Sequence, residues 1–273
     1  MAVITISRQV AALGDEIASA LAKEIGYTFI DRKAIEARIV ALGFPAEKLK
    51  KYDERKPGFF ASLAKDRDEY LDYLQLAVLE AAAKDNCILI GRGSFVILEN
   101  VPNHFAVRFV ANDAVRMERL KNEFSWEDKQ AKQRISESAT NRSGFHKSFF
   151  NVDNEDSTHY HLVLNTGMLD IDSAVKVLKD LKDILVTPEK EAAGKAKIEE
   201  LLMAQRLVNK LIFEYNLNIN FLHAVITGKT LTLQGVADSS ALVEKAITVS
   251  QKAFPDYKIE SAISVVQDFK AYP

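Results

Sequence analysis

The chain has 273 residues, of which 48% are hydrophobic and 27% are charged, and its formal net charge is −2. This composition is ordinary for a globular protein, and the near-neutral charge gives no bulk attraction for nucleic acid. The single cysteine, Cys87, excludes an internal disulfide and fits a buried thiol in a reducing compartment. No signal-peptide pattern opens the sequence, and no apolar run reaches the roughly 18 residues of a membrane span. We therefore expect a cytoplasmic protein with no membrane span and no nucleic-acid partner.

The first half of the chain is organised around residues 2–20. A β-rich apolar run, Val3–Ile6, leads through Ser7 and Arg8 into a turn of small residues, and a helix follows from about Asp15. A strand, a tight turn and a helix form the frame of phosphate-binding loops, because the turn amides and the positive end of the helix point at one place. A Walker A loop would read G-x-x-x-x-G-K-[ST], and most of its glycines and its lysine are absent here.

Strands and helices alternate as far as about residue 185. Strands are expected at 27–30, 87–90, 105–110 and 161–165, and helices at 32–42, 62–84, after Asn112, at 126–150 and at 171–185. The segment 47–56 is highly charged, ends at Pro57–Gly58 and is typical of a solvated helix end. Continuous apolar runs such as Cys87–Ile90 suit parallel strands that are buried on both faces. The pattern predicts an α/β fold with a parallel sheet and helices on both faces.

The composition changes at residues 187–197, which contain no large apolar side chain and are the best candidate for a linker. Beyond the linker we expect a helix, a two-stranded hairpin around Gly228–Lys229, a second helix and a last strand. The expected bounds are 198–215, 220–227, 230–235, 239–254 and 258–266. The length suits this division into a medium domain, 1–186, the linker, and a small α+β domain, 198–273.

Several strand ends carry residues that suit an anionic ligand. Ligands bind at the carboxyl ends of the strands of such a sheet, where this chain has Ser7–Arg8, Asp31–Arg32, Gly91–Arg92–Gly93 and Asn165–Thr166. Arginine binds phosphate oxygens through paired hydrogen bonds and stays charged, and the two glycines allow a close backbone approach. The alternatives are ordinary ones. An arginine after a strand is often a surface ion-pair partner, and an aspartate there is often a helix N-cap.

The basic helical region 129–147 is a candidate lid, in which Arg134 and Arg142 would meet transferring phosphates. The alternative is a solvated helix face. The histidines show no metal-ligand spacing, so we expect no metal site within the protein's own residues. No Ser–His–Asp or Cys–His arrangement can be argued from the sequence either.

Six blocks follow one another along about residues 1–185. They read ITISRQVAALGDEIA, YTFIDRKAI, KKYDERKPGFF, ILIGRGSFVIL, VRFVANDAVRMERL and YHLVLNTGMLDIDSAV. Together they resemble the cytidylate kinase-like family of P-loop nucleoside monophosphate kinases. The resemblance implies a P-loop kinase-type sheet, a nucleotide-monophosphate region over roughly residues 31–85 and a lid near residues 125–150.

The same resemblance implies roles for single residues. Asp31 would lie beside the acceptor nucleotide, and Arg92, between Gly91 and Gly93, would contact the substrate phosphate. Arg134 or Arg142 would serve the lid in catalysis. The loop from Ser7 to Glu16 would bind the donor nucleotide, with ATP and Mg²⁺ as cofactors if the protein is active and none otherwise. The expected ligand is a nucleotide or another small anionic molecule.

The loop departs from the family pattern, which looks like S-R-x-x-G-S-G-G followed by a polar residue. This chain keeps Ser7, Arg8 and Gly14, but Ala11, Ala12 and Leu13 stand where Gly-Ser-Gly would. Glycines let such a loop adopt positive φ and let phosphates approach the backbone amides. The side chains at positions 11 and 13 would therefore cost strain or would occupy the phosphate volume.

Two acidic residues, Asp15 and Glu16, add negative charge where the β- and γ-phosphates would lie, although acids in a first helical turn also stabilise the helix dipole. Two functions stay open. One is ATP-dependent phosphoryl transfer to a nucleoside monophosphate. The other is that of a non-catalytic regulatory or partner-binding protein with a degenerate phosphate loop.

The C-terminal block reads ITGKTLTLQGVADSSALVEKAITVSQKAFPDYKIESAISVV. It has a glycine turn, the pattern T-L-x-G-x-V/A-D-S, a helix that ends at a proline, and a final strand. These features resemble the BON domain, a small α-β-β-α-β module. The resemblance implies that residues 198–268 bind a ligand or a protein partner, and the alternative is a purely structural appendage.

Overall fold

The computed structural model describes residues 2–49, 52 and 65–266, and the chain divides into two compact units, 1–197 and 198–273. The strands of the first unit are β1 (Val3–Arg8), β2 (Thr28–Ile30), β3 (Cys87–Ile90), β4 (His104–Val110) and β5 (Leu162–Asn165). Its helices are α1 (Gly14–Ile25), α2 (Arg32–Ala41), α3 (Ala46–Leu49), α4 (Lys65–Ala82), α5 (Ser94–Ile97), α6 (Asp113–Phe124), α7 (Asp128–Phe150) and α8 (Ile171–Leu185). The predicted alternation of strands and helices is confirmed.

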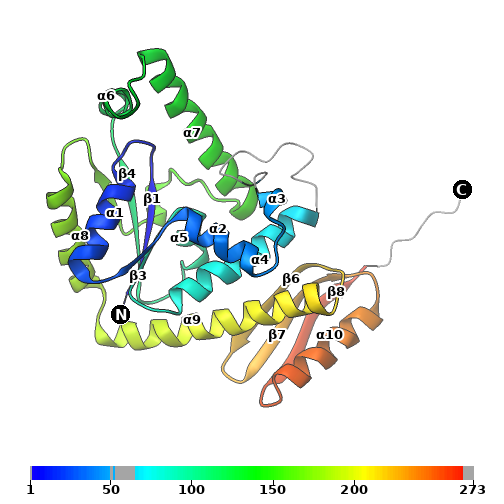
Figure 1. Ribbon diagram of the computed structural model, residues 1–273. Coiled ribbons are helices and arrows are strands. Elements are labelled where there is room, and N and C mark those ends of the chain that lie inside the picture. Colours follow the sequence, from blue (N-terminus) through cyan, green and yellow to red (C-terminus); the bar gives the residue numbers. More distant parts are fainter. Residues whose placement is uncertain (1, 50–51, 53–64, 267–273) are drawn as a thin grey trace, which may run out of the picture. The chain divides into compact units, whose positions relative to one another are not determined.

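The first unit is built on a five-stranded sheet in the order β2-β3-β1-β4-β5, and every pair in it is parallel. β1 is central, so that Ile4 is paired with Ile88 on one side and with Phe105 on the other. This order and direction confirm the predicted P-loop kinase-type α/β fold. Because all strands are parallel, their carboxyl ends lie at one edge, and α6 and α7 lie beyond that edge (Figure 1).

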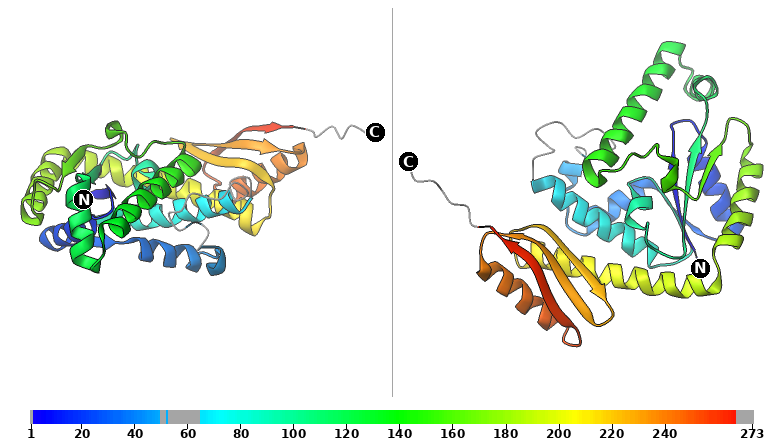
Figure 2. Two further views of the ribbon diagram at one scale, coloured as in Figure 1. Left: turned by 90° about the horizontal axis from the view of Figure 1, so that it is seen from above. Right: turned by 180° about the vertical axis from the view of Figure 1, so that it is seen from behind.

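One face of the sheet is covered by α1 and α8, which lie together on the same side in both figures of the whole chain (Figure 2). Ile17 and Leu21 of α1 and Leu178 of α8 are fully buried against Ile6 of β1 and other apolar strand residues. On the opposite face, the short helix α5 places Phe95 against Ala106 of β4. Both faces are buried, which explains why the strands read as continuous apolar runs.

Local capping sets the bounds of several helices. Gly26 ends α1 in the left-handed conformation, with φ 69°. The Asn112 side chain accepts a 2.9 Å hydrogen bond from the Val115 N–H and begins α6, as the sequence predicts. No helix among residues 2–49 and 65–266 is long and apolar enough to cross a membrane.

The segment predicted as a linker is helical. It forms the first part of α9 (Pro188–Asn209), so the prediction that this helix starts at Ile198 is wrong. The physical reason lies in its composition, since alanine, glutamate and lysine are good helix formers and proline suits the first helical position. Thr187 Oγ1 accepts a 3.4 Å hydrogen bond from the Lys190 N–H at the start of the helix. The domain bounds 1–186 and 198–273 stay predictions. Two other predictions lie outside the described residues, namely the helix start at Ser62 and most of the charged segment 47–56.

The second unit contains the end of α9, a short π-helical turn (Lys210–Glu214), and a three-stranded sheet covered by α10 (Ser240–Ala253). Its strands are β6 (Ile219–Thr227), β7 (Thr230–Ala237) and β8 (Lys258–Val265), in the order β6-β7-β8. β6 and β7 form the predicted hairpin, in which Gly228 has φ 60°, and β8 runs parallel to β7. The predicted α-β-β-α-β order is confirmed.

Candidate functional site

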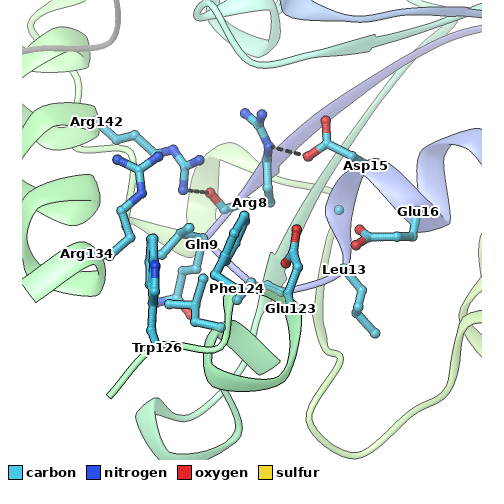
Figure 3. A pocket seen from close by; sticks show the side chains of 15 residues that line it. Arg8, Gln9, Leu13, Asp15, Glu16, Glu123, Phe124, Trp126, Arg134 and Arg142 are labelled. Atoms are coloured by element: carbon cyan, nitrogen blue, oxygen red, sulfur yellow. Dashed lines mark hydrogen bonds and ion pairs between the residues drawn. The ribbon is translucent and has the colours of Figure 1, made fainter. Parts of the chain in front are cut away.

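The loop that follows β1 begins at Arg8 and ends in the first turn of α1. Gly14 is required there because a Cβ atom at this position would lie 2.6 Å from Cγ of Arg8. This close approach brings the Arg8 side chain over the start of the helix, where its Nε lies 3.5 Å from Oδ2 of Asp15. Arg8 and Asp15 are therefore an ion pair across the loop (Figure 3).

Two residues of the loop that are not glycine adopt a backbone conformation that usually requires glycine. Ala11 has φ 58° and Leu13 has φ 55°, both in the left-handed region. The family pattern has glycine at both of these positions. Side chains here are predicted to cost strain or to occupy the phosphate volume, and the structure shows the strain. The Leu13 side chain is half-buried against the core beside α1 and points away from Arg134 and Arg142 (Figure 3).

Leu13 is also the N-cap of α1, and its side chain makes no capping hydrogen bond. The first N–H groups of an α-helix have no partner within the helix, and the helix dipole adds positive potential at the same end. The loop thus presents backbone donors to the space in front of α1, which is the arrangement that binds phosphate at helix N-termini.

Three residues that the sequence analysis did not single out as loop supports hold the loop in this conformation. Arg119 on α6 donates from Nη1 to the Ala11 carbonyl at 3.0 Å, and Thr166 donates from Oγ1 to the Ala12 carbonyl at 3.0 Å. Gln9 Oε1 accepts a 3.0 Å hydrogen bond from the Ala111 N–H. The sequence does place Thr166 among the strand-end residues that suit an anionic ligand, because it follows Asn165.

The loop forms one wall of a pocket of about 680 Å³, whose other wall comes from α6 and α7 (Figure 3). The pocket brings together most of the predicted donor-site residues with both predicted lid arginines. Its lining includes Arg8, Ala11, Ala12, Leu13, Gly14, Asp15, Glu16, Arg134 and Arg142. Ser7 does not line the pocket, and its Oγ accepts a 3.2 Å hydrogen bond from the buried Arg108.

The two lid arginines have different environments. Arg142 donates from Nη1 to the Arg8 carbonyl at 2.8 Å and so ties α7 to the loop. Arg134 is exposed to the pocket and has no hydrogen bond or ion pair with the part of the chain that the structure describes. The Arg134 guanidinium is therefore open to the pocket.

The charges of the pocket balance. Arg8, Arg134 and Arg142 are opposed by three carboxylates, Asp15, Glu16 and Glu123, which line the same space. The carboxylates of Asp15 and Glu16 lie on the α1 side, whereas Arg134 and Arg142 come from α7 (Figure 3). An anionic group is thus favoured near α7 and disfavoured near the side chains of the first turn of α1.

An aromatic wall completes the pocket, and the sequence analysis missed it. The rings of Phe124 and Trp126 are stacked with centroids 4.7 Å apart and an interplanar angle of 25°. Both side chains line the pocket, and the Phe124 side chain is 48% exposed. An exposed aromatic face beside the loop offers a surface on which a planar ring can stack.

The predicted acceptor-site residues lie at the end of β3 and the start of α2, and none of them lines the pocket of the loop. Gly91, Arg92 and Gly93 all have positive φ, and the Arg92 side chain is only 1% exposed. Arg92 forms an ion pair with Glu36 and donates to the Tyr52 carbonyl at 2.7 Å. Its predicted contact with a substrate phosphate stays a prediction, and in this structure its guanidinium is engaged within the protein.

Asp31 begins α2, and its Oδ1 accepts a 2.8 Å hydrogen bond from the Ala34 N–H. The N-cap alternative for Asp31 is therefore what the structure shows. The block KKYDERKPGFF, which belongs to the same predicted region, lies outside the described residues except for Tyr52.

Two buried titratable groups away from the pocket are held in their neutral forms. Burial lowers the pKa of His104 to about 3, so its ring is neutral, and its Nε2 lies 2.6 Å from Thr5 Oγ1. Burial raises the pKa of the Cys87 thiol to about 12, which leaves no thiolate at neutral pH. Among the described residues, no group of three or more His, Cys, Asp or Glu side chains is placed to hold a metal ion.

Comparison with known proteins supports this description of the first unit. The model of the cytidylate kinase-like family matches residues 3–168. The solved structure of an uncharacterized protein from Eubacterium ventriosum has a TM-score of 0.53 and 17% identity, covering 67% of this chain and 99% of that chain. A shikimate kinase from Bacteroides thetaiotaomicron has a TM-score of 0.42 and 18% identity, and the match covers 67% of this chain and 98% of that chain. At 17% identity the likeness to the Eubacterium ventriosum structure shows the fold alone, and among curated proteins none matches the chain.

Proposed function

The chain belongs to the cytidylate kinase-like family, and from this premise we propose that the pocket of the loop binds a nucleotide. The observation that carries the proposal is the loop itself. It has left-handed backbone at Ala11 and Leu13, and it faces Arg134 and Arg142 across one pocket. Neither an ordinary surface turn nor a solvated helix face accounts for this combination.

The parts of the pocket suggest how a nucleotide would lie. Its phosphates would accept hydrogen bonds from the first-turn N–H groups of α1 and from Arg134 and Arg142. Its base would stack on the exposed ring of Phe124, which is itself stacked on the half-buried Trp126. The pocket volume of about 680 Å³ is within the range of small-molecule sites.

The charges on α1 favour binding over rapid phosphoryl transfer. Asp15 directly follows Gly14, where a Walker A loop has its lysine, and Asp15 is paired with Arg8 instead. A phosphate about 4 Å from such a carboxylate would lose about 4 kcal/mol at an effective dielectric constant of about 20, and less at an exposed group. We therefore propose a nucleotide-binding protein in which transfer is slow or absent.

Phosphoryl transfer from ATP to a nucleoside monophosphate is the second candidate, and the convergence of Arg134 and Arg142 on the loop favours it. Arginines in this position would stabilise the charge of a transferring phosphoryl group. The backbone donors fit the phosphates of ATP, but a metal ion would have to enter with those phosphates. No described cluster of side chains is placed to hold the ion alone.

The proposal can be tested by intrinsic fluorescence, because Trp126 is the only tryptophan of the chain and lines the pocket. Titration with ATP, CMP and CTP, with and without Mg²⁺, should quench or shift its emission for at least one nucleotide. Arg134→Ala should weaken that binding about tenfold, the loss of about 1.4 kcal/mol expected for one exposed charge-assisted contact. Lys132→Ala, on the same helix but outside the pocket lining, is the matched control and should bind as the parent does.

Two results would contradict the proposal. One is the absence of any emission change or thermal shift with all three nucleotides. The other is an equal loss of affinity in the Arg134 and Lys132 variants, which would mean that only the bulk charge of α7 matters. A transfer assay from ATP to a panel of nucleoside monophosphates then separates the two candidates.

For the second unit we propose the BON-like binding role that its sequence implies. What supports it is the observed α-β-β-α-β order and the exposed Phe221, whose side chain is 74% exposed. The family match ends at residue 168, so it does not reach this unit.

A further inference from the structure

The second unit ends in a strand, β8, that is paired on one side only within the described part of the chain. β8 (red in Figure 1) stands last in the strand order β6-β7-β8. The open edge of a sheet exposes a row of N–H and C=O groups that can pair with another strand. Folded proteins usually carry features that prevent such pairing, so the edges of both sheets were compared for them.

The other three edge strands of the two sheets have protective features. β2 has three residues and β5 has four, and such short strands offer few backbone groups to a partner. β6 is irregular, because its register with β7 shifts between Asn220 and His223 and the Phe221 backbone between them has φ 53°. A bulge of this kind interrupts the row of groups along the edge.

β8 is regular instead. It has eight residues, it contains no proline, and its register with β7 continues without a shift over its whole length. Its two charged residues, Lys258 and Glu260, lie near its start and form an ion pair with each other at 2.6 Å. Its last residue and the next one are apolar, with Val265 44% and Val266 55% exposed. β8 is therefore a long, regular edge with no net charge.

Hydrogen bonds show which residues of β8 face the free edge. The N–H groups of Lys258 and Val266 donate toward the β7 side, at 2.8 and 3.0 Å. Backbone groups of successive residues point to opposite sides of a strand, so the odd-numbered residues between these two face the edge. The Ile263 N–H agrees with this, since it donates at 3.3 Å to Ser261 Oγ within its own strand.

The sequence of β8 suits an antiparallel pairing with itself. Around a two-fold axis at Ala262, Ile259 lies opposite Val265 of a second copy, and Ser261 lies opposite Ile263 of that copy. These are the residues whose backbone groups face the edge, so each pair exchanges two hydrogen bonds. Their side chains share the face on which Ile259 and Ile263 pack against the core, so the exposed Val265 gains an apolar neighbour.

The residues of the other face fit the same pairing. Ala262 lies opposite Ala262 of the second copy in a pair without hydrogen bonds, where the strands come closest and a small side chain is suitable. Glu260 lies opposite Ser264, and Lys258 lies opposite Val266. No two like charges are opposed, and both exposed valines obtain a neighbour from the second copy.

From this unprotected and self-complementary edge we infer that two copies of the chain associate through β8, antiparallel to each other. The product is a continuous six-stranded sheet in the order β6-β7-β8-β8-β7-β6. An axis at Ser261 would pair the same edge groups but would leave Val266 beyond the paired strands, so the axis is placed at Ala262. A two-fold pairing closes on itself, since it covers both β8 edges and leaves neither open for a third copy.

The mass of the full chain, measured by sedimentation at increasing concentration, tests the inference. A monomer–dimer equilibrium with a dissociation constant below about 100 μM is expected for a small interface of this kind. Ser261→Pro should weaken the dimer at least about tenfold, because the Ser261 N–H faces the free edge and proline there spares the pairing with β7. Ser261→Val keeps the N–H and is the matched control, which should dimerise as the parent does. Circular dichroism should show both variants folded.

Disulfide trapping tests the register. Two copies of Ala262→Cys would have Cα atoms about 4.5 Å apart across the axis, which is within the range of a disulfide. Ser264→Cys is exposed on the same face, but its two copies would lie roughly 14 Å apart along the strands. Ala262→Cys should therefore cross-link at least tenfold faster than Ser264→Cys. The parent should not cross-link, because its only cysteine, Cys87, is buried.

Three results would overturn the inference. A monomer at all concentrations up to about 500 μM would leave an extended segment of another protein as the occupant of the edge. A folded Ser261→Pro variant that dimerises as the parent does would mean that the copies meet elsewhere. Equal rates of cross-linking at positions 262 and 264 would show that the strands do not pair around Ala262.

Discussion

The sharpest prediction concerns two neighbouring alanines of the loop, which should respond to glycine in opposite ways. Ala11 has φ 58°, a conformation that costs an L-residue roughly 1–2 kcal/mol. Ala12 is outside the left-handed region and is fully buried in the core beside α1. The same chemical change, alanine to glycine, therefore removes strain at one position and only packing at the next.

The magnitudes follow from three contributions. Glycine at position 11 relieves about 1.5 kcal/mol of strain, costs about 0.7 kcal/mol in chain entropy and loses about 0.4 kcal/mol from a half-buried methyl group. The free energy of unfolding should thus be unchanged or rise slightly. Ala12→Gly has no strain to relieve and loses a fully buried methyl group, so it should lower the free energy of unfolding by about 1.5 kcal/mol.

Leu13→Gly lies between these cases. It relieves the same strain, since Leu13 has φ 55°, but it also removes a half-buried side chain worth about 1–1.5 kcal/mol. We expect a loss of about 0.5 kcal/mol, so that stability decreases in the order Ala11→Gly, Leu13→Gly, Ala12→Gly.

The assay is urea unfolding monitored through Trp126, the single tryptophan, which lies in the first unit and so reports on that unit alone. The difference between the Ala11 and Ala12 variants, nearly 2 kcal/mol, corresponds to roughly 4–8 °C in melting temperature for a unit of this size. If the two variants lose equal stability, the loop is not strained at position 11 and the reasoning fails.

Three further predictions address the pocket, the buried ion pair and the buried histidine. Asp15→Asn removes a carboxylate from the α1 side of the pocket and should tighten triphosphate binding up to about fivefold, measured by Trp126 fluorescence; unchanged affinity would show that this carboxylate does not face the phosphates. Arg92→Met removes the buried cation of Glu36, which keeps its ion pair with the more exposed Arg32, and should cost about 2 kcal/mol in urea unfolding, whereas adding Glu36→Leu should recover part of it; equal costs for the single and double variants would argue against the pair. The pKa of His104 falls from 6.5 to about 3 on folding, so the unfolded chain binds a proton that the folded chain rejects, and stability is lost as pH falls below 6.5. His104→Gln should flatten this dependence between pH 6.5 and about pH 4 by up to about 1.4 kcal/mol per pH unit, and an unchanged slope would mean that other groups carry it.

The fold could be predicted because its signals are local and repeated. Continuous apolar runs gave the strands, caps such as Asn112 gave helix starts, and the order of the blocks gave the family. The candidate pocket could be predicted in part for the same reason, since Arg8 to Glu16 form one continuous loop. Arg134 and Arg142 reach that loop because α7 passes over the carboxyl edge of the sheet. The lid that the family resemblance implies lies in the same part of the chain.

Other features depend on partners that are distant in the sequence. Arg92 had the spacing of a ligand-binding arginine, yet it is buried against Glu36, which is 56 positions away. The sequence does not indicate a binding role for Phe124 and Trp126, because two aromatic residues at a helix junction usually belong to a core. The predicted helix start at Ile198 was wrong for a different reason, since the absence of large apolar residues from 187–197 excludes a core position but does not exclude a solvated helix.

The loop shows that a turn can lack glycine at two positions and still keep a left-handed backbone there. Steric cost disfavours positive φ at Ala11 and Leu13 by a few kcal/mol in total. Three hydrogen bonds from outside the loop, donated by Arg119, Thr166 and Arg142 to loop carbonyls, oppose that cost. Each is worth about 1 kcal/mol net, and more where the donor is charged, so together they match the strain. The backbone shape is therefore maintained by its surroundings, while the side chains at the Walker positions have changed the charge of the site. A protein built in this way can keep the geometry for binding phosphates and still lack the lysine that would make their transfer fast.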